Sequence, residues 1–378
     1  MTESKSEPAA AEAPAAPGAG AAHPPPVRPG SNLRQGMIGR ISRRFRARAE
    51  LALPAVPSLV PHYVEVLAEH FLALGRPFSA EELSGLSRVL LMKAREGFRQ
   101  SPYSSIVVRY ETADDGSLRI NYAIAASVST MASEYESWVA TRKPPLFGAS
   151  ADARVLSALE GLPGPSVCLD LGAGTGRNAL PMARRGHEVI AVEPAPALAN
   201  VLREAASAEG LGVTVVEADA LSGDLSSAEG RCALAVASQV TSHLRSKEEL
   251  RGLFAAMARA LAPGGVGLVT AFLVADGRRL DVAAREAAQA LWSTFFTRED
   301  LASALHGLPL KLASSEDAIA YEKAHLPEGA WPLTGWFEEW ASGVDVFGVQ
   351  DDPPISLRWL VFERRAGTVP DAPGATRE

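Results

Sequence analysis

The stretch VCLDLGAGTGRNALPMARRGHEVIAVEP, residues 167–194, decides the fold. A short apolar run ends near Asp170, three glycines follow at alternate positions, and a helical segment then leads into a second apolar run. Glycine lets the backbone turn tightly and approach a ligand closely, because no Cβ intervenes. A strand, a glycine-rich turn, a helix and a second strand form one βαβ unit. The stretch therefore predicts a parallel sheet with a ligand site beyond the carboxyl ends of its strands.

The same alternation of apolar runs and helical segments continues along the chain. Strands are expected at 167–171, 187–193, 212–217, 232–239, 265–273, 309–314 and 356–363. Most of them are separated by helices, which are expected at 151–161, 176–185, 196–208, 247–262 and 298–306. Crossover helices between strands require a mostly parallel sheet that is covered on both faces. The predicted fold class is α/β, with a seven-stranded, doubly wound, Rossmann-like sheet.

The glycine spacing separates two classes of ligand. Dinucleotide folds carry G-x-G-x-x-G and hold a pyrophosphate at the helix N-terminus, whereas Gly172, Gly174 and Gly176 follow G-x-G-x-G. The carboxylate of Asp170 precedes this loop, and it repels a pyrophosphate but suits a cationic amino-acid ligand. We therefore expect S-adenosylmethionine (SAM) as the cofactor, and an NAD(P) oxidoreductase is the disfavoured alternative.

Later strand ends add further polar side chains at the same edge of the sheet. Glu193 ends the second strand, where a carboxylate can accept hydrogen bonds from both ribose hydroxyls. Asp219 follows the third strand and can accept from an adenine amino group. The fourth strand ends in SQVTSH (238–243), and LAPGG (261–265) stops a helix and turns the chain into the fifth strand.

Taken together, these motifs resemble the class I SAM-dependent methyltransferases. The resemblance covers roughly 149–365 and depends on DLGAGTG, Glu193, EADA (217–220) and LAPGG in this order. Within the class, GRNALPMARRGHEVIAVE, the FFTREDLASAL helix and the closing strand ISLRWLVFERR are similar to the tellurite-resistance (TehB-like) branch. The resemblance implies a sheet in the order 3-2-1-4-5-7-6, with the seventh strand antiparallel.

The resemblance also implies which residues bind SAM. Asp170 and the glycines are expected at its methionine part, Glu193 at the ribose and Asp219 at the adenine. The aromatic residues Tyr135 and Trp138 are expected to close over the methionine end, with core packing as the alternative. The complete expected set is Asp170, Gly172, Ala173, Gly174, Gly176, Asn178, Glu193, Asp219, Ala220, Ser238, Tyr135 and Trp138.

His243 is the candidate catalytic base, because it follows the fourth strand beside the expected position of the methyl group. In-line methyl transfer depends mostly on alignment and on exclusion of water. A thiolate acceptor needs no base, whereas a hydroxyl or amine can need one. A structural role for His243 at the strand-to-helix turn is the alternative. Cysteine and histidine nowhere have zinc-site spacing, so no metal site is expected.

The part of the chain before the sheet divides by composition. Residues 1–30 hold nine Ala, seven Pro and three Gly, which predicts a disordered leader. Six arginines in 33–50 against one acid, Glu50, predict a solvated basic arm. Helical periodicity from 58, a capping box from Ser79 and alternating runs around Asp115-Gly116 predict two helices and a β-hairpin.

These expectations divide the chain into four parts, of which the second is expected to cap the cofactor pocket. The parts are a leader and arm at 1–50, the cap at 51–148, the methyltransferase domain at 149–365 with a Trp-rich insertion at 316–355, and a disordered tail at 366–378. Three tryptophans lie in the insertion, where packing is expected, with an aromatic lid over the substrate as the alternative.

Charge and composition narrow the class of function. The formal net charge of −7 argues against a protein that mainly binds nucleic acid. Both cysteines lie in apolar runs, no apolar run is long enough for a membrane span, and no signal peptide is recognised. These features predict a cytoplasmic protein. We expect a small-molecule methyl acceptor. The alternatives are an RNA or protein methyltransferase that uses the Arg-rich arm for docking, and a non-catalytic SAM-binding protein.

Overall fold

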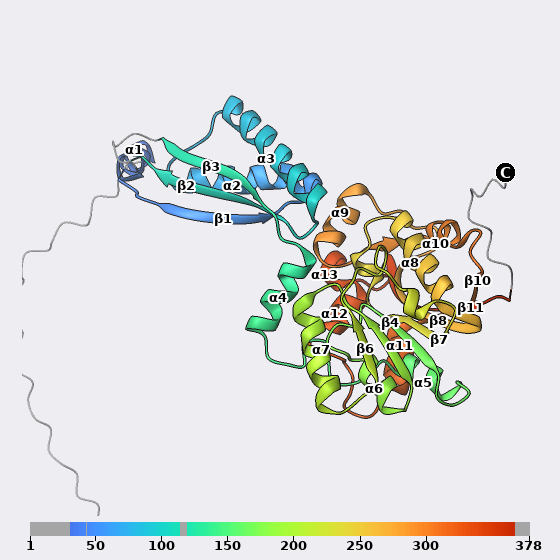
Figure 1. Ribbon diagram of the computed structural model, residues 1–378. Coiled ribbons are helices and arrows are strands. Elements are labelled where there is room, and N and C mark those ends of the chain that lie inside the picture. Colours follow the sequence, from blue (N-terminus) through green and yellow to red (C-terminus); the bar gives the residue numbers. More distant parts are fainter. Residues whose placement is uncertain (1–30, 43, 114–118, 367–378) are drawn as a thin grey trace, which may run out of the picture.

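The computed structural model describes residues 31–42, 44–113 and 119–366, shown in Figure 1. The leader expected at 1–30 and nearly all of the expected tail lie outside these residues. Within the described ranges, no helix combines the length and the apolar character that crossing a bilayer requires.

The larger of two sheets has the expected strand order. Its path is β10-β11-β8-β7-β4-β5-β6, which is the predicted order read from the other edge. β4 to β8 run parallel, and β11 is antiparallel to both of its neighbours. A two-residue strand that the sequence did not predict, β9 (Phe295–Phe296), pairs with β8. The path strands are β4 (Val167–Leu171), β5 (Glu188–Val192), β6 (Val213–Val216), β7 (Cys232–Ala237), β8 (Leu261–Val274), β10 (Leu310–Asp317) and β11 (Ile355–Arg364).

Both faces of this sheet are buried. Leu169 and Ile190 belong to one apolar cluster, and their neighbours Cys168 and Val189 belong to another on the opposite face. Since successive side chains of a strand point to opposite faces, strands buried on both sides read as continuous apolar runs. The expected helices are confirmed as α5 (Ala153–Glu160), α6 (Ala179–Arg184), α7 (Pro196–Ala208), α8 (Lys247–Ala260) and α10 (Arg298–Leu305).

A smaller N-terminal unit lies beside the larger one and extends away from it (Figure 1). Three antiparallel strands in the order β1-β2-β3 pack against two helices. The predicted helices and the paired strands of the hairpin are confirmed, and the capping box between Ser79 and Glu82 is formed. The turn expected at Asp115-Gly116 lies outside the described residues. The elements of this unit are β1 (Arg48–Pro54), α2 (Val60–Ala73), α3 (Ala80–Gln100), β2 (Ser105–Thr112) and β3 (Ile120–Ser127).

The basic arm expected at 33–50 is only partly an arm. Its first part forms α1 (Ser31–Ser42), and β1 begins at Arg48 and pairs with β2 along its whole length. Leu51 and Leu53 of β1 pack on the core of the N-terminal unit. Sequence periodicity missed this strand because it has only two core-facing apolar residues and ends in Pro54.

Contacts between the N-terminal unit and the larger unit include the following three. The N–H of Ser58 donates to Glu286 Oε2 at 2.9 Å, in α9 (Val282–Ala290). The guanidinium of Arg245 donates to the carbonyls of Phe98 and Arg99 at 2.6 and 3.0 Å. The third point is the turn after α3, whose residues 100–103 reach the cavity described below. Within the described part of this unit, residues 100–103 line the cavity, and its helices and sheet extend away from the larger unit (Figure 1).

Candidate active site

A cavity of about 670 Å³ lies at the carboxyl ends of the central parallel strands. The loops that follow β4, β5, β6 and β7 form one side of it. The structure brings almost all of the predicted site residues together here. Those that line the cavity are Asp170, Gly172, Ala173, Gly174, Asn178, Glu193, Asp219, Ala220, Ser238, Tyr135, Trp138 and His243.

Gly176 is the exception, because it packs instead of lining the cavity. Its φ is +93°, and a Cβ there would lie 2.4 Å from Leu202 Cδ1 and 2.9 Å from Leu180 Cγ. Glycine at this position therefore lets the loop close against α7. The spacing G-x-G-x-G could not separate this packing role from a ligand contact.

Asp170 has a buried oxygen that lacks a partner. The residue is 2% exposed, and Oδ2 accepts no hydrogen bond from any residue that the structure describes. Burial raises the pKa of Asp170 to about 7, against the lowering effect of Arg177. A buried carboxylate oxygen without a donor is unfavourable. This position is therefore suited to a ligand that brings a cationic donor.

Glu193 is held by the backbone of two loops. Its Oε2 accepts from the N–H of Gly174 and its Oε1 from the N–H of Ala195, each at 2.8 Å. Burial raises its pKa, and these two bonds lower it. Each carboxylate oxygen can accept more than one hydrogen bond, so both retain capacity for ribose hydroxyls. Asp219 lies at the exposed rim, where its Oδ1 accepts from the N–H of Leu221 at 2.6 Å.

His243 connects two tyrosines from different parts of the chain. Its Nδ1 lies 2.9 Å from the hydroxyl of Tyr103, and its Nε2 lies 3.0 Å from the hydroxyl of Tyr135. Burial lowers the pKa of His243 to about 4 and raises the pKa of both tyrosines. All three side chains are therefore neutral near pH 7, and the imidazole donates to one hydroxyl and accepts from the other.

Aromatic rings enclose the end of the cavity around His243. Trp292 stacks on Tyr103 with 4.0 Å between ring centroids, and it lies 5.3 Å from Trp138 by the same measure. The indole of Trp340 donates to the carbonyl of Trp292 at 3.0 Å. Tyr135 and Trp138 belong to α4 (Met131–Thr141). Sequence reasoning missed Tyr103 and Trp292, because nothing local in a turn or a helix end marks a residue that lines a distant cavity.

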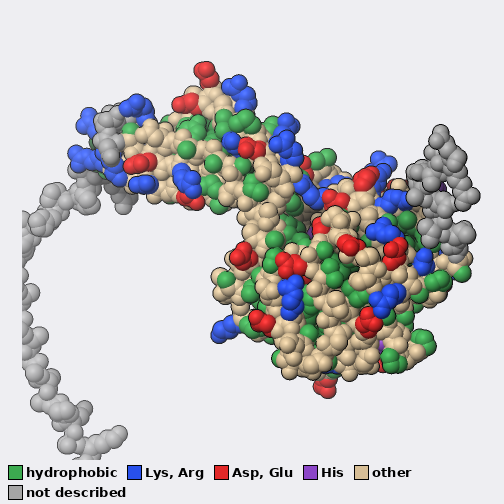
Figure 2. Space-filling view, in the orientation of Figure 1, with side chains coloured by type: hydrophobic (Ala, Val, Ile, Leu, Met, Phe, Trp, Pro, Cys, Tyr) green, Lys and Arg blue, Asp and Glu red, His purple; other side chains and the backbone are tan. Residues whose placement is uncertain are grey.

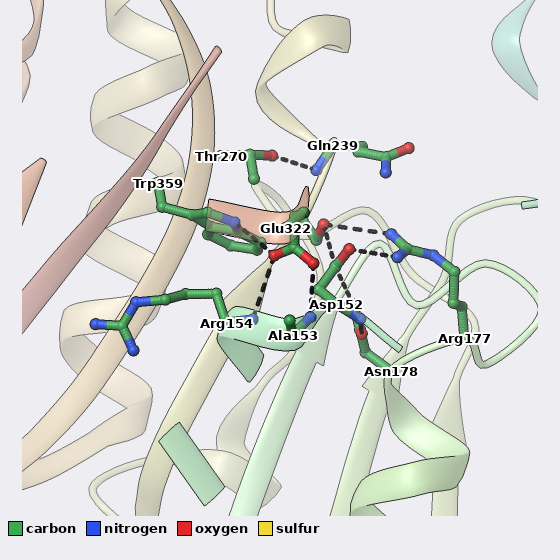
Figure 3. Close-up of polar contacts among 10 residues, drawn as sticks. Asp152, Ala153, Arg154, Arg177, Asn178, Gln239, Thr270, Glu322 and Trp359 are labelled. Carbon is green, nitrogen blue, oxygen red and sulfur yellow. Dashed lines mark hydrogen bonds and ion pairs between the residues drawn. The ribbon is translucent and has the colours of Figure 1, made fainter. Parts of the chain in front are cut away.

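A buried polar network around Asp152 contributes Arg177, Asn178 and Ser238 to the cavity wall (Figure 3). Arg177 follows the glycine loop and forms an ion pair with Asp152, and both side chains are almost fully buried. Ser238 Oγ and Asn178 Nδ2 donate to Asp152 Oδ2 at 2.7 and 2.8 Å. Sequence analysis singled out Ser238 and Asn178 but not the charged pair, whose members are 25 residues apart.

In the described part of the chain, no group of three or more His, Cys, Asp or Glu side chains is arranged to hold a metal ion. The two cysteines, Cys168 and Cys232, are buried, and burial raises their pKa values to about 12 and about 11.

One family model matches the part of the chain that contains the glycine loop. Residues 168–265 match the family model Methyltransf_25, described as a methyltransferase domain. A comparison with curated proteins gives no match.

Solved structures similar to this chain include the following three. A geranyl diphosphate methyltransferase in complex with GPP and sinefungin has a TM-score of 0.45 and 18% identity over 56% of this chain and 77% of that one. The [4+2]-cyclase SpnF has a TM-score of 0.44 and 17% identity over 63% of this chain and 97% of that one. The third is geranyl diphosphate C-methyltransferase from Streptomyces coelicolor A3(2), in complex with Mg²⁺, geranyl diphosphate and S-adenosyl-L-homocysteine. It has a TM-score of 0.42 and 17% identity over 56% of this chain and 77% of that one.

The strand order and the matched family model agree on one class. The chain carries a Rossmann-like methyltransferase domain, and the enzyme class is SAM-dependent methyltransferase. The methyl acceptor does not follow from these likenesses.

Proposed function

We propose that this cytoplasmic protein transfers the methyl group of SAM to a small molecule with an apolar or aromatic body. The observation that carries the proposal is one cavity with two kinds of lining. Buried carboxylates and glycine backbone form the polar lining, and aromatic rings form the aromatic lining. Within the class, the motifs quoted from 176–193, 295–305 and 355–365 favour the tellurite-resistance branch.

The residues of the polar lining fit the parts of SAM. The unpartnered Oδ2 of Asp170 is suited to the ammonium group, and the free acceptor capacity of Glu193 is suited to the ribose hydroxyls. Asp219 stands at the rim, where an adenine amino group can donate to its Oδ2. Gly174 has a positive φ value and lines the cavity without a Cβ, which gives the ligand room, whereas a Cβ on Gly172 would lie 2.5 Å from Val240 Cγ2.

The aromatic lining aligns the methyl acceptor with SAM and excludes water. When bound, SAM supplies an electrophilic methyl group on a sulfonium. The faces of Trp138, Trp292 and Tyr135 form a dry wall next to this position, and aromatic faces favour a nearby positive charge. They also hold an apolar acceptor in place by burial. Holding two reactants in line is sufficient for a large rate increase.

His243 is poorly placed to remove a proton directly from an acceptor. Both of its ring nitrogens are engaged by tyrosines, and its pKa of about 4 makes it a weak base at neutral pH. We infer that His243 positions Tyr103 and Tyr135. The acceptor atom is then one that is nucleophilic without help from a base, such as a thiolate.

A methyl-transfer assay on a source-cell extract tests the proposal. The protein is incubated with extract and methyl-labelled SAM, and the products are divided into small molecules, lipid, protein and RNA. Label in the small-molecule or lipid fraction supports the proposal. Label in protein or RNA supports the alternative in which the arginines of α1 and the following residues dock a macromolecule. No label, with SAM binding intact, supports a non-catalytic SAM-binding protein.

Two matched variants control this assay. Asp170→Ala removes the carboxylate at the cavity and should abolish labelling. Asp276→Ala removes a carboxylate of similar size that is 74% exposed and pairs with Arg298 on the surface. Labelling with Asp170→Ala that matches the wild-type level, and exceeds that of the extract alone, counts against the assignment.

A further inference from the structure

Arg177 is a buried cation on the wall of the cavity. Its side chain is 7% exposed and that of its partner Asp152 is 2% exposed. A guanidinium carries five N–H donors. One contacts Asp152 Oδ1 and another reaches Ser238 Oγ at 3.4 Å. No other described residue has a hydrogen bond with Arg177 side-chain donors, so they remain available to an anion in the cavity.

The carboxylate of Asp152 is turned toward Arg177 and away from its own helix. Asp152 is the N-cap of α5, a position where an aspartate ordinarily accepts from the first N–H groups of its helix. In the described structure its side chain makes no such bond. It accepts instead from Arg177, Ser238 and Asn178.

Glu322 provides the cap that Asp152 leaves open (Figure 3). This residue is 1% exposed and belongs to α11 (Ala318–His325), in the Trp-rich insertion. Its oxygens accept from the N–H groups of Ala153 and Arg154 at 2.7 and 3.2 Å. The indole of Trp359 donates to it at 2.9 Å and fixes its orientation. A carboxylate from 169 residues away thus satisfies the helix end.

We propose that the Arg177–Asp152 pair binds the α-carboxylate of SAM. The pair is directed to the cavity because Glu322 caps α5 in the place of Asp152. The amino-acid end of SAM carries one ammonium and one carboxylate group. Asp170 offers the unpartnered anion and Arg177 the buried cation on the walls of one cavity. The two charges of the ligand are therefore matched by two charges of opposite sign. Arg177 is a binding residue in this proposal and Glu322 a positioning residue.

Binding of two ligands that differ in one group tests this proposal. Decarboxylated SAM keeps the ammonium, the sulfonium and the nucleoside but lacks the carboxylate. By calorimetry, wild type should bind SAM about 10- to 100-fold more tightly than decarboxylated SAM, the range expected for charge-assisted hydrogen bonds. Arg177→Met should remove this preference by weakening SAM alone, and Arg177→Lys should restore part of it. A wild type without the preference, or an equal loss for both ligands in Arg177→Met, would overturn the proposal.

Further variants distinguish a positioning role of Glu322 from a nonspecific loss of ligand binding. Arg184→Met is the matched control, since Arg184 lies on α6, is 49% exposed and pairs with Glu209 on the surface. It should leave both affinities unchanged. Glu322→Gln should reduce the preference for SAM in the same direction as Arg177→Met but less. If it weakens both ligands equally, Glu322 is not a positioning residue. The inference depends on the SAM site, and wild type that binds neither ligand would refute that site itself.

Discussion

At the scale of single residues, Asp170 illustrates a conflict between stability and ligand binding. Burial raises its pKa from an ordinary 3.8 to about 7, and one oxygen has no partner among the described residues. A group whose pKa is higher in the folded state stabilises the fold most at low pH. That stability is lost as pH rises from about 4 to about 7. Ionised Asp170 therefore destabilises the ligand-free protein near neutrality.

We predict that Asp170→Asn stabilises the ligand-free protein while it abolishes SAM binding. At pH 8 the free energy of unfolding should rise by about 1–3 kcal/mol, because a shift of one pKa unit corresponds to about 1.4 kcal/mol and the amide still needs partners. The gain should be smaller at pH 5.5, where folded Asp170 is already protonated. Urea unfolding at both pH values measures this. A variant that is less stable than wild type at pH 8 would contradict it.

The same titration makes SAM affinity depend on pH. An ammonium group pairs with the ionised form of Asp170, so binding below pH 7 requires release of a proton. Affinity should therefore rise up to tenfold per pH unit between about 5.5 and 7 and then level off. Calorimetry at pH 6 in buffers of different ionisation enthalpy should show close to one proton released. Glu322, whose pKa burial also raises to about 7, does not line the cavity, and repeating the titration with Glu322→Gln separates its indirect contribution from that of Asp170. Proton uptake, or no release, would argue against an Asp170–ammonium contact.

At the scale of elements, the glycine loop after β4 combines two functions that a substitution can separate. Gly174 has a φ of +57°, and a Cβ there would project into the cavity 3.5 Å from the ring of Phe147. Gly176 faces the opposite way, against Leu202 and Leu180. The first position therefore concerns the ligand, and the second concerns the packing of the loop on α7.

We predict opposite effects for alanine at these two glycines. Gly174→Ala should weaken SAM binding at least tenfold while it costs only about 1–2 kcal/mol of stability, the strain of a left-handed residue. Gly176→Ala should cost about 2–4 kcal/mol, because strain and an overpacked contact add together. Thermal unfolding and SAM titration of both variants measure the two effects. Equal loss of stability in the two variants would show that the loop acts as one unit.

Local patterns predicted the elements that carry long signals. The strands of the parallel sheet and the helices between them have continuous apolar runs or a 3.6-residue period, and they were predicted within a few residues. β1 and β9 have too few core-facing residues to show a period. The same distinction holds in the site. Asp170, Gly174 and Glu193 stand at strand ends within one βαβ unit, whereas Tyr103 and Arg177 acquire their roles from partners that only the fold brings near.

At the scale of the whole molecule, the N-terminal unit is part of the cavity wall. Tyr103 follows α3 and stacks on Trp292 of the larger unit, and Arg245 holds the end of α3 by its carbonyls. The opposite end of the unit carries α1, where Lys and Arg side chains gather over the surface (Figure 2). This end also exposes Leu33, Met37 and Ile41. The end of the unit at Tyr103 thus contributes to the aromatic lining of the cavity. The end at α1 presents a basic surface distant from the larger unit.

We predict that removing residues 1–45 leaves methyl transfer to a small molecule unchanged. The cut spares β1, which begins at Arg48, and the bond from the N–H of Ala47 to Thr112 Oγ1. A longer deletion of residues 1–54 removes β1 and should lower both stability and activity, because β2 becomes an unpaired edge. Activity on the labelled acceptor and its dependence on salt should be measured for both. If the shorter deletion loses affinity and salt dependence, the arginines dock an anionic macromolecule, as charge neutralisation at a phosphate backbone requires. Unchanged turnover would instead separate the basic end from catalysis.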